Sequence, residues 1–191
     1  MNSTLHPLLD GTMQLSSALL VNVSPKLNAQ NTAILHRLQR GQLLAIAPDS
    51  PGGLLIVKSF YVDFAGPGAA VGGEFDRHCT AVYIVGTVRL QTIAHQSDRE
   101  DAIQTRLAYV EQLSHIVDNP NAQQRGRAIV HQLAEWLPGN LSLTIPAELT
   151  AGLAGVLPTT VQMAWQSHKE LAGDIPTFNP RSARMPVAQF A

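Results

Sequence analysis

The chain has 191 residues, a formal net charge of −1 and a single cysteine. This length fits one domain, one cysteine excludes an intramolecular disulfide, and a near-neutral charge excludes the basic footprint of a specific DNA-binding domain. Charged residues make up only 14% of the chain, against about 25% in an average soluble domain. Two interpretations stay open: an alanine- and glutamine-rich genome, or a subunit whose surface is covered in an assembly, where charged residues are depleted.

The N-terminal region carries no sign of a targeting or membrane segment. Its first positively charged residue is Lys26, and the apolar run 18–23 is too short for a signal core or a membrane span. We therefore expect a cytoplasmic protein that does not enter a membrane. We expect a single domain over 1–191, with a polar lead-in at 1–28 and a C-terminal arm at 174–191.

A helix followed by strands is predicted for the first half of the chain. Asn28 or Asn31 is a suitable N-cap for a helix through Gln39, and Gly41 is suited to end it. Apolar runs rich in β-branched residues, separated by turns of glycine and proline, then predict strands over 43–47, 54–64 and 80–93. Consecutive strands joined by turns favour an antiparallel or mixed sheet.

The strongest helix signal covers residues 98–117. Ser97 and Glu100 have the spacing of a capping box, with the serine as N-cap. Apolar residues then recur every three or four positions, at Ile103, Leu107, Val110, Leu113 and Val117. We expect this stripe to pack on the sheet, so that truncating Leu107 to alanine costs about 2–5 kcal/mol.

The second half of the chain predicts more helix and one late strand. A helix is expected over 122–137, and a short one from Thr144 with Pro146 in its first turn. The alternation of apolar and polar residues over 161–165 is typical of a half-buried strand. The predicted class is α+β: an antiparallel or mixed sheet flanked by helices, with an extended terminal arm.

The sequence contains no pattern that carries known reaction chemistry. Neither a Cys-x-x-Cys nor a spaced histidine pair is present, the glycines of 66–73 miss the dinucleotide fingerprint, and Cys79 is interpreted as a small buried thiol. We therefore expect no metal, no cofactor and no enzymatic activity. Asp49, Asp63, Glu74 and Asp76 lie near turns that would meet at one end of the sheet, but the sequence leaves their convergence open.

The expected elements include the strand Val82–Leu90, then the helix from Asp101 to Val117, then late strands around 161–165 and 186–190. This order of elements resembles that of the tail-terminator and tail-completion proteins of tailed bacteriophages. That resemblance implies a structural subunit of a phage tail or neck, located in the virion. It also implies self-association into a ring, such as a hexamer, that docks on neighbouring structural subunits.

Two segments are the expected interface of such a ring. One is the glycine-rich loop 65–75 and the other is the C-terminal arm, which has apolar anchors between polar residues. The candidate interface residues are Gly66, Gly68, Gly72, Ile175, Phe178, Met185, Val187 and Phe190. The alternatives are an arm that folds back on its own domain, and a bacterial ligand- or protein-binding α/β module that works as a sensor.

Overall fold

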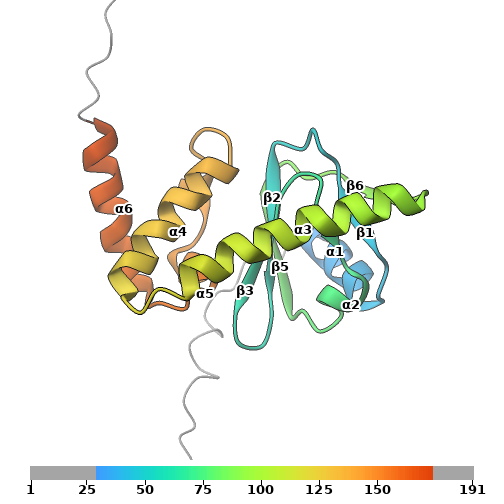
Figure 1. Cartoon of the computed structure of the whole chain (residues 1–191), viewed down its shortest axis with the longest axis horizontal. Coiled ribbons are helices and arrows are strands. Elements are labelled where there is room, and N and C mark those ends of the chain that lie inside the picture. The colour runs from blue at the N-terminus through green and yellow to red at the C-terminus, as the bar shows by residue number, and fades with distance from the viewer. Residues whose placement is uncertain (1–28, 174–191) are drawn as a thin grey trace, which may run out of the picture.

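A computed structural model of the chain describes residues 29–173, which combine helices with two antiparallel sheets (Figure 1). The α+β class predicted from the sequence is confirmed. The predicted lead-in at 1–28 and the arm at 174–191 lie outside the described residues.

Each sheet has three strands. The first has the order β4-β1-β6 and is built from Ala70–Val71, Leu44–Ile46 and Leu90–Thr92. The second has the order β3-β2-β5 and is built from Val62–Ala65, Gly52–Val57 and Ala81–Gly86. In the second sheet Leu55 stands opposite both Phe64 and Tyr83, so these three side chains share one face.

Two of the predicted strands are each divided in the structure. The run 54–64 is a hairpin, β2 and β3, whose turn closes with a 2.9 Å hydrogen bond from the Lys58 amide to the Tyr61 carbonyl. The run 80–93 becomes β5 and β6 in different sheets. Gly86 ends β5 with a φ of +70°, a conformation that glycine adopts at little cost, and the chain then crosses to β1.

Helix α1, Ala29–Gln39, confirms the first predicted helix and buries Ile34 and Leu38 against the sheets. Gly41 follows it with a φ of +74°, as expected of a glycine after a helix end. A single turn, α2 (Gly73–Asp76), follows β4 and brings Asp76 into the interior.

Helix α3, Gln96–Val117, is the longest element and runs across both sheets (Figure 1). Its N-terminal half packs small residues, Ala102 on Ala45 and Ala70, against the first sheet. The predicted capping box is not formed, because His95 is the N-cap and Ser97 already lies inside the helix.

The second half of the chain forms a group of helices beside the second sheet (Figure 1). It consists of α4 (Ala122–Trp136), a short 3₁₀ turn η1 (Leu141–Thr144), α5 (Ala147–Ala154) and α6 (Pro158–Gly173). The helix predicted at 122–137 and the short one near Pro146 are confirmed.

The strand predicted at 161–165 is wrong, because these residues belong to α6. Pro158 is the first residue of this helix, a position where its missing N–H is no loss. Val161 and Ala164, three residues apart, are buried against α4 and α5. The alternation of apolar and polar residues over 161–165 was thus a short stretch of a helical pattern.

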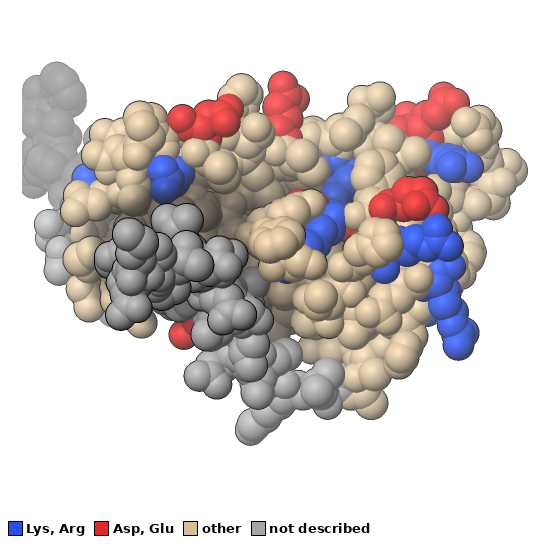
Figure 2. Space-filling view, turned by 90° about the horizontal axis from the view of Figure 1, so that it is seen from below, with Lys and Arg blue, Asp and Glu red and all other residues tan. Residues whose placement is uncertain are grey.

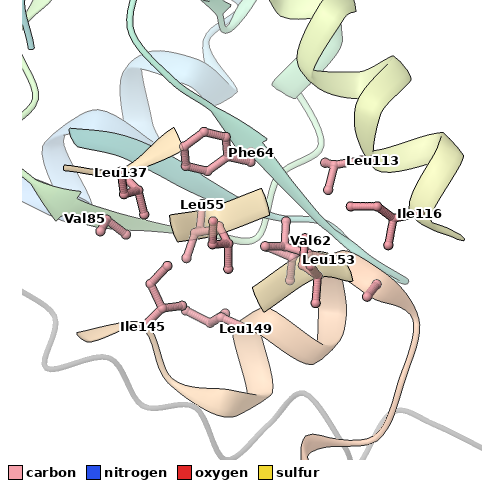
Figure 3. Packing of buried hydrophobic residues seen from close by; sticks show 13 residues of the cluster. Leu55, Val62, Phe64, Val85, Leu113, Ile116, Leu137, Ile145, Leu149 and Leu153 are labelled. Atoms are coloured by element: carbon pink, nitrogen blue, oxygen red, sulfur yellow. The ribbon is translucent and has the colours of Figure 1, made fainter. Parts of the chain in front are cut away.

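The main hydrophobic core lies between the second sheet and helices α3, α4 and α5 (Figure 3). Phe64 of β3 is fully buried there and stacks on Trp136 of α4, with ring centroids 4.8 Å apart. Tyr109 of α3 meets both rings edge-on. The opposite face of this sheet packs on the first sheet and α1, forming a second cluster.

Across residues 29–173, none of the helices combines the length and apolar character needed to cross a membrane.

Candidate functional site

A cleft of about 640 Å³ opens between α3, the β2–β3 turn and the end of α5. Nine large apolar side chains are exposed within residues 29–168, whose side-chain burial is described, and six of them line this cleft. We call these six the apolar wall: Phe60, Tyr61, Phe75, Leu107, Val110 and Val117. Scattered exposed apolar residues need no explanation, but their collection in one concave place is typical of a binding site.

The wall comes from three elements that meet at this point. Phe60 and Tyr61 stand on the β2–β3 turn, Phe75 on α2, and the rest on α3. Figure 2 shows the molecule from the side on which this turn lies; uncharged side chains make up most of the part not covered in grey, and charged groups of both signs gather in its right-hand half.

The apolar stripe predicted on α3 is only partly its buried face: Leu113 is buried and Ile103 is partly buried, but the other three members are exposed. The buried residues are Ala102, Arg106, Leu113 and Ile116, with Tyr109 partly buried between them. Leu107, Val110 and Val117 are instead 40–45% exposed. Helix α3 carries apolar residues on two neighbouring faces, and only one of them covers the sheet. The expectation that Leu107 is a core residue is wrong.

Four charged side chains form a cluster beneath the wall, which we call the ionic tetrad: Lys58, Asp63, Asp76 and Arg106. They come from four places in the fold, namely the end of β2, strand β3, the α2 turn and the middle of α3. Asp76 and Arg106 are 0% and 1% exposed. Charges this deeply buried are tolerated only when they are paired and hydrogen-bonded.

Arg106 is the centre of the tetrad. Its Nη2 donates to Asp63 Oδ2 at 2.6 Å and to Asp76 Oδ1 at 3.3 Å. Lys58 Nζ lies 3.2 Å from Asp76 Oδ1 and 3.9 Å from Asp63 Oδ2, and also donates to the carbonyl of Phe75. The carboxylates accept backbone bonds as well, Asp63 from Phe64 N–H and Asp76 from Gly72 N–H.

One polar atom of the tetrad has no partner. Nη1 of Arg106 is closed to solvent and makes no hydrogen bond with any group in residues 29–173. Leaving a buried donor unsatisfied costs about 1–3 kcal/mol, more for a charged group. Arg106 also lines the cleft, so the residue that carries the unsatisfied donor links the buried tetrad to the apolar wall.

The tetrad also affects the nearby thiol. Cys79 is 2% exposed, and burial, assisted by the negative charge of Asp76, raises the pKa of this thiol above its ordinary value. A thiol with a raised pKa is a poor nucleophile at neutral pH. Cys79 is thus placed as a small buried side chain of the second cluster.

Of the four acids that were candidates for convergence, the structure brings two together. Asp63 and Asp76 share Arg106, whereas Asp49 pairs with Arg89 at the surface and Glu74 pairs with Arg77. The Arg89 guanidinium holds the pKa of Asp49 below its ordinary value.

Sequence reasoning missed the two cations of the tetrad, Lys58 and Arg106. A usable signal existed for Arg106, because positions 102, 106, 109, 113 and 116 follow the alternating four- and three-residue spacing of a buried helix face. An arginine inside such a spacing indicates a buried charge that needs a carboxylate partner.

The predicted interface residues divide into two groups. Gly66 and Gly72 are buried inside the fold and Gly68 is partly buried, beside Thr105. A Cβ at Gly66 would lie 2.3 Å from the hydroxyl of Tyr109, so this glycine allows α3 to approach the loop. The other candidates, Ile175, Phe178, Met185, Val187 and Phe190, lie outside the described residues.

Within the described part of the chain, no group of three or more His, Cys, Asp or Glu side chains is placed to hold a metal ion. The two carboxylates that do meet, Asp63 and Asp76, already bind Arg106 and Lys58.

No family model matches the chain, and no curated protein does. Among solved structures, the chain is similar to a transcriptional regulator of the CRP family from Thermus thermophilus. The TM-score is 0.49 and the identity 10%, over 69% of this chain and 77% of the other. A likeness of this degree does not assign the chain to that family.

The prediction of a structural subunit of a phage tail or neck is corrected here. The solved structure reported above is described as a transcriptional regulator. In addition, the segment 161–165, one of the late strands on which the resemblance depended, is helical. The alternative of a sensor-like binding module is the one that we pursue, and its support comes from the cleft.

Proposed function

We propose that this chain is a sensor-like binding module whose ligand is a small, largely apolar organic molecule, held in the cleft between α3 and the β2–β3 turn. The observation that carries the proposal is the apolar wall: six of the nine exposed large apolar side chains of residues 29–168 line one cleft of about 640 Å³. Ligand sites are usually concave, mostly apolar and about 300–1,000 Å³ in volume.

Binding without reaction is part of the proposal. The charged groups nearest the cleft are paired with each other, because Lys58 and Arg106 both contact Asp63 and Asp76. A general acid or base needs a proton site that is free to exchange with a substrate. The tetrad supports this part of the proposal because its charges hold the floor of the cleft together.

The arrangement also suits a sensor. The cleft is bounded by α3, which spans both sheets, and by the β2–β3 turn, which is linked to α2 through Lys58. A ligand that contacts all three elements stabilises their present positions relative to any other arrangement. The signal would then be a change in how firmly these elements are held.

The test is binding of N-phenyl-1-naphthylamine, an uncharged dye whose fluorescence rises in apolar surroundings, to the full chain. We expect saturable enhancement that Leu107→Asn weakens at least about fivefold, because the variant places an amide in the wall. Met163→Asn is the matched control, since Met163 is 52% exposed on α6 and does not line the cleft. Absence of saturable binding, or an equal effect of both variants, would refute the proposal.

A further inference from the structure

We infer that the ligand of this cleft is an uncharged organic molecule that carries one strong hydrogen-bond acceptor, of the ketone, ester or amide class, on an apolar body. The inference rests on the proposed function and adds the chemistry of the ligand's polar end. It is carried by Arg106, which joins the ionic tetrad to the cleft.

The first step is the count of donors. A guanidinium has five N–H donors and no acceptor. Nη2 of Arg106 serves Asp63 and Asp76, whereas Nη1 has no partner among the described residues. The tetrad therefore has hydrogen-bond donors left over on a residue that lines the cleft, and a ligand oxygen that accepts a hydrogen bond is the group that complements them.

The second step is the charge balance. The tetrad contains two cations and two carboxylates, with every cation–carboxylate contact between 2.6 and 3.9 Å. Because these charges cancel, no net positive charge remains to offset the desolvation of an anionic ligand. An anion bound at Nη1 would also lie close to Asp63 and Asp76. A cationic ligand is disfavoured as well, since it brings further donors to a donor.

The third step is access. Nη1 is closed to solvent, so a ligand oxygen reaches it only after a covering side chain moves. Binding of the acceptor is thus coupled to a small rearrangement of the side chains that cover Arg106.

The experiment compares four probes that share a phenylalkyl body: 4-phenylbutan-2-one, butylbenzene, 4-phenylbutanoate and 3-phenylpropylammonium. Each is titrated into the ¹⁵N-labelled full chain, and dissociation constants are taken from amide chemical shifts. We expect the ketone to bind about tenfold more tightly than butylbenzene, the value of one hydrogen bond to a charged group. We expect the carboxylate and the ammonium probes to bind more weakly than the ketone.

The outcomes separate this inference from the proposed function. If no probe shifts the cleft resonances, the proposed function itself fails. If butylbenzene matches the ketone, or the carboxylate binds more tightly than the ketone, the cleft is a binding site but the inference about the acceptor is wrong.

A variant at Arg106 tests the inference about the acceptor in a second way. In Arg106→Lys the charge is kept and the second arm of the guanidinium is lost, so the advantage of the ketone over butylbenzene should fall to about twofold or less. Arg89→Lys, in the surface pair with Asp49, is the control and should keep the full advantage. If Arg106→Lys does not fold, the comparison of probes on the unmodified chain decides alone.

Discussion

Arg106 is the residue on which the local structure of the site most depends. It ties α3 to β3 and to α2 through Asp63 and Asp76, in surroundings where only 1% of its side chain is exposed. A buried ion pair contributes little net stability when formed, but removing one partner leaves a buried charge without compensation. The tetrad is therefore a cluster whose members are not individually replaceable.

Arg106→Met should lower the free energy of unfolding by about 3–5 kcal/mol, because Lys58 alone then faces two buried carboxylates. Urea unfolding followed by circular dichroism measures this change. The control is Arg89→Met, which breaks the surface pair with Asp49 and should leave the transition midpoint where it was. Similar midpoints for the two variants would show that the tetrad is not buried as described.

Cys79 offers a test of burial at a single atom. Since burial raises the pKa of its thiol, the thiolate is rarer in the folded chain than in the unfolded chain. We expect 5,5′-dithiobis(2-nitrobenzoate) at pH 8 to label the native chain at least about a hundredfold more slowly than the chain in 6 M guanidinium, in line with the populations of open states. Labelling at comparable rates would contradict the placement of Cys79.

The raised pKa of Cys79 also determines how the stability of the fold changes with pH. The folded-state pKa of Cys79 lies above its ordinary value of 9.0, so the stability that this group contributes is present below pH 9 and is lost as the pH rises toward the folded-state pKa. Tyr109, whose pKa burial also raises, acts in the same direction from about pH 10 upward. Cys79→Ala should make the decline of stability between pH 8.5 and 10 less steep in urea titrations.

At the scale of elements, α3 is a helix with two apolar faces and two tasks. One face covers the sheets and holds Arg106, and the other is left open as part of the apolar wall. A helix that needs only to cover a sheet has one apolar stripe, with polar residues opposite. The second face is the feature of α3 that packing does not explain and that the proposed binding site would explain.

Leu107→Ala and Leu113→Ala form a matched pair on this helix. Leu113 is 7% exposed and Leu107 is 45% exposed. We expect Leu113→Ala to cost about 2–4 kcal/mol of unfolding free energy and Leu107→Ala less than about 1 kcal/mol. Denaturant unfolding measures both values, and a larger cost at Leu107 than at Leu113 would mean that the faces of α3 are assigned the wrong way round.

The loop from β3 to α2 is an integral part of the fold, and Gly72 tests this. Gly72 has a φ of +83°, and a Cβ there would lie 2.0 Å from the Gln42 carbonyl oxygen. Gly139 also has a positive φ, +58°, but open space around it. Gly72→Ala should therefore destabilise by clearly more than the ~1 kcal/mol that the left-handed conformation alone costs at Gly139→Ala. Equal thermal midpoints would argue against the tight packing of this loop.

At the scale of the whole molecule, the sequence predicted correctly those helices whose ends are set by residues close to them in the chain. Helix α1 was predicted because a cap residue and Gly41 mark its ends. Helix α4 was predicted as well, and in the structure the Asn121 side chain caps its first turn. Segment 161–165 was assigned wrongly because five residues fit both a strand and a helix period. The choice between them was made by packing against α4 and α5, which a short window does not contain.

The site was less predictable than the fold for the same reason. Lys58, Asp63, Asp76 and Arg106 lie on four elements, and Arg106 is 30 and 43 positions along the chain from its two partners. The two carboxylates were among the candidates because they stand near turns, but only the crossing of α3 over β3 brings the arginine to them. The three wall residues of α3, Leu107, Val110 and Val117, were taken for core because exposure depends on which face of α3 meets the sheet.

The most direct test of the binding site is an amide chemical-shift map of the full chain with 4-phenylbutan-2-one. If the ligand binds in the cleft, we expect the largest shifts on the elements that line it: the β2–β3 turn at 58–62, Phe75, and α3 from Arg106 to Val117. Shifts that remain absent at saturating probe, or that centre on α6 around Met163, would contradict it.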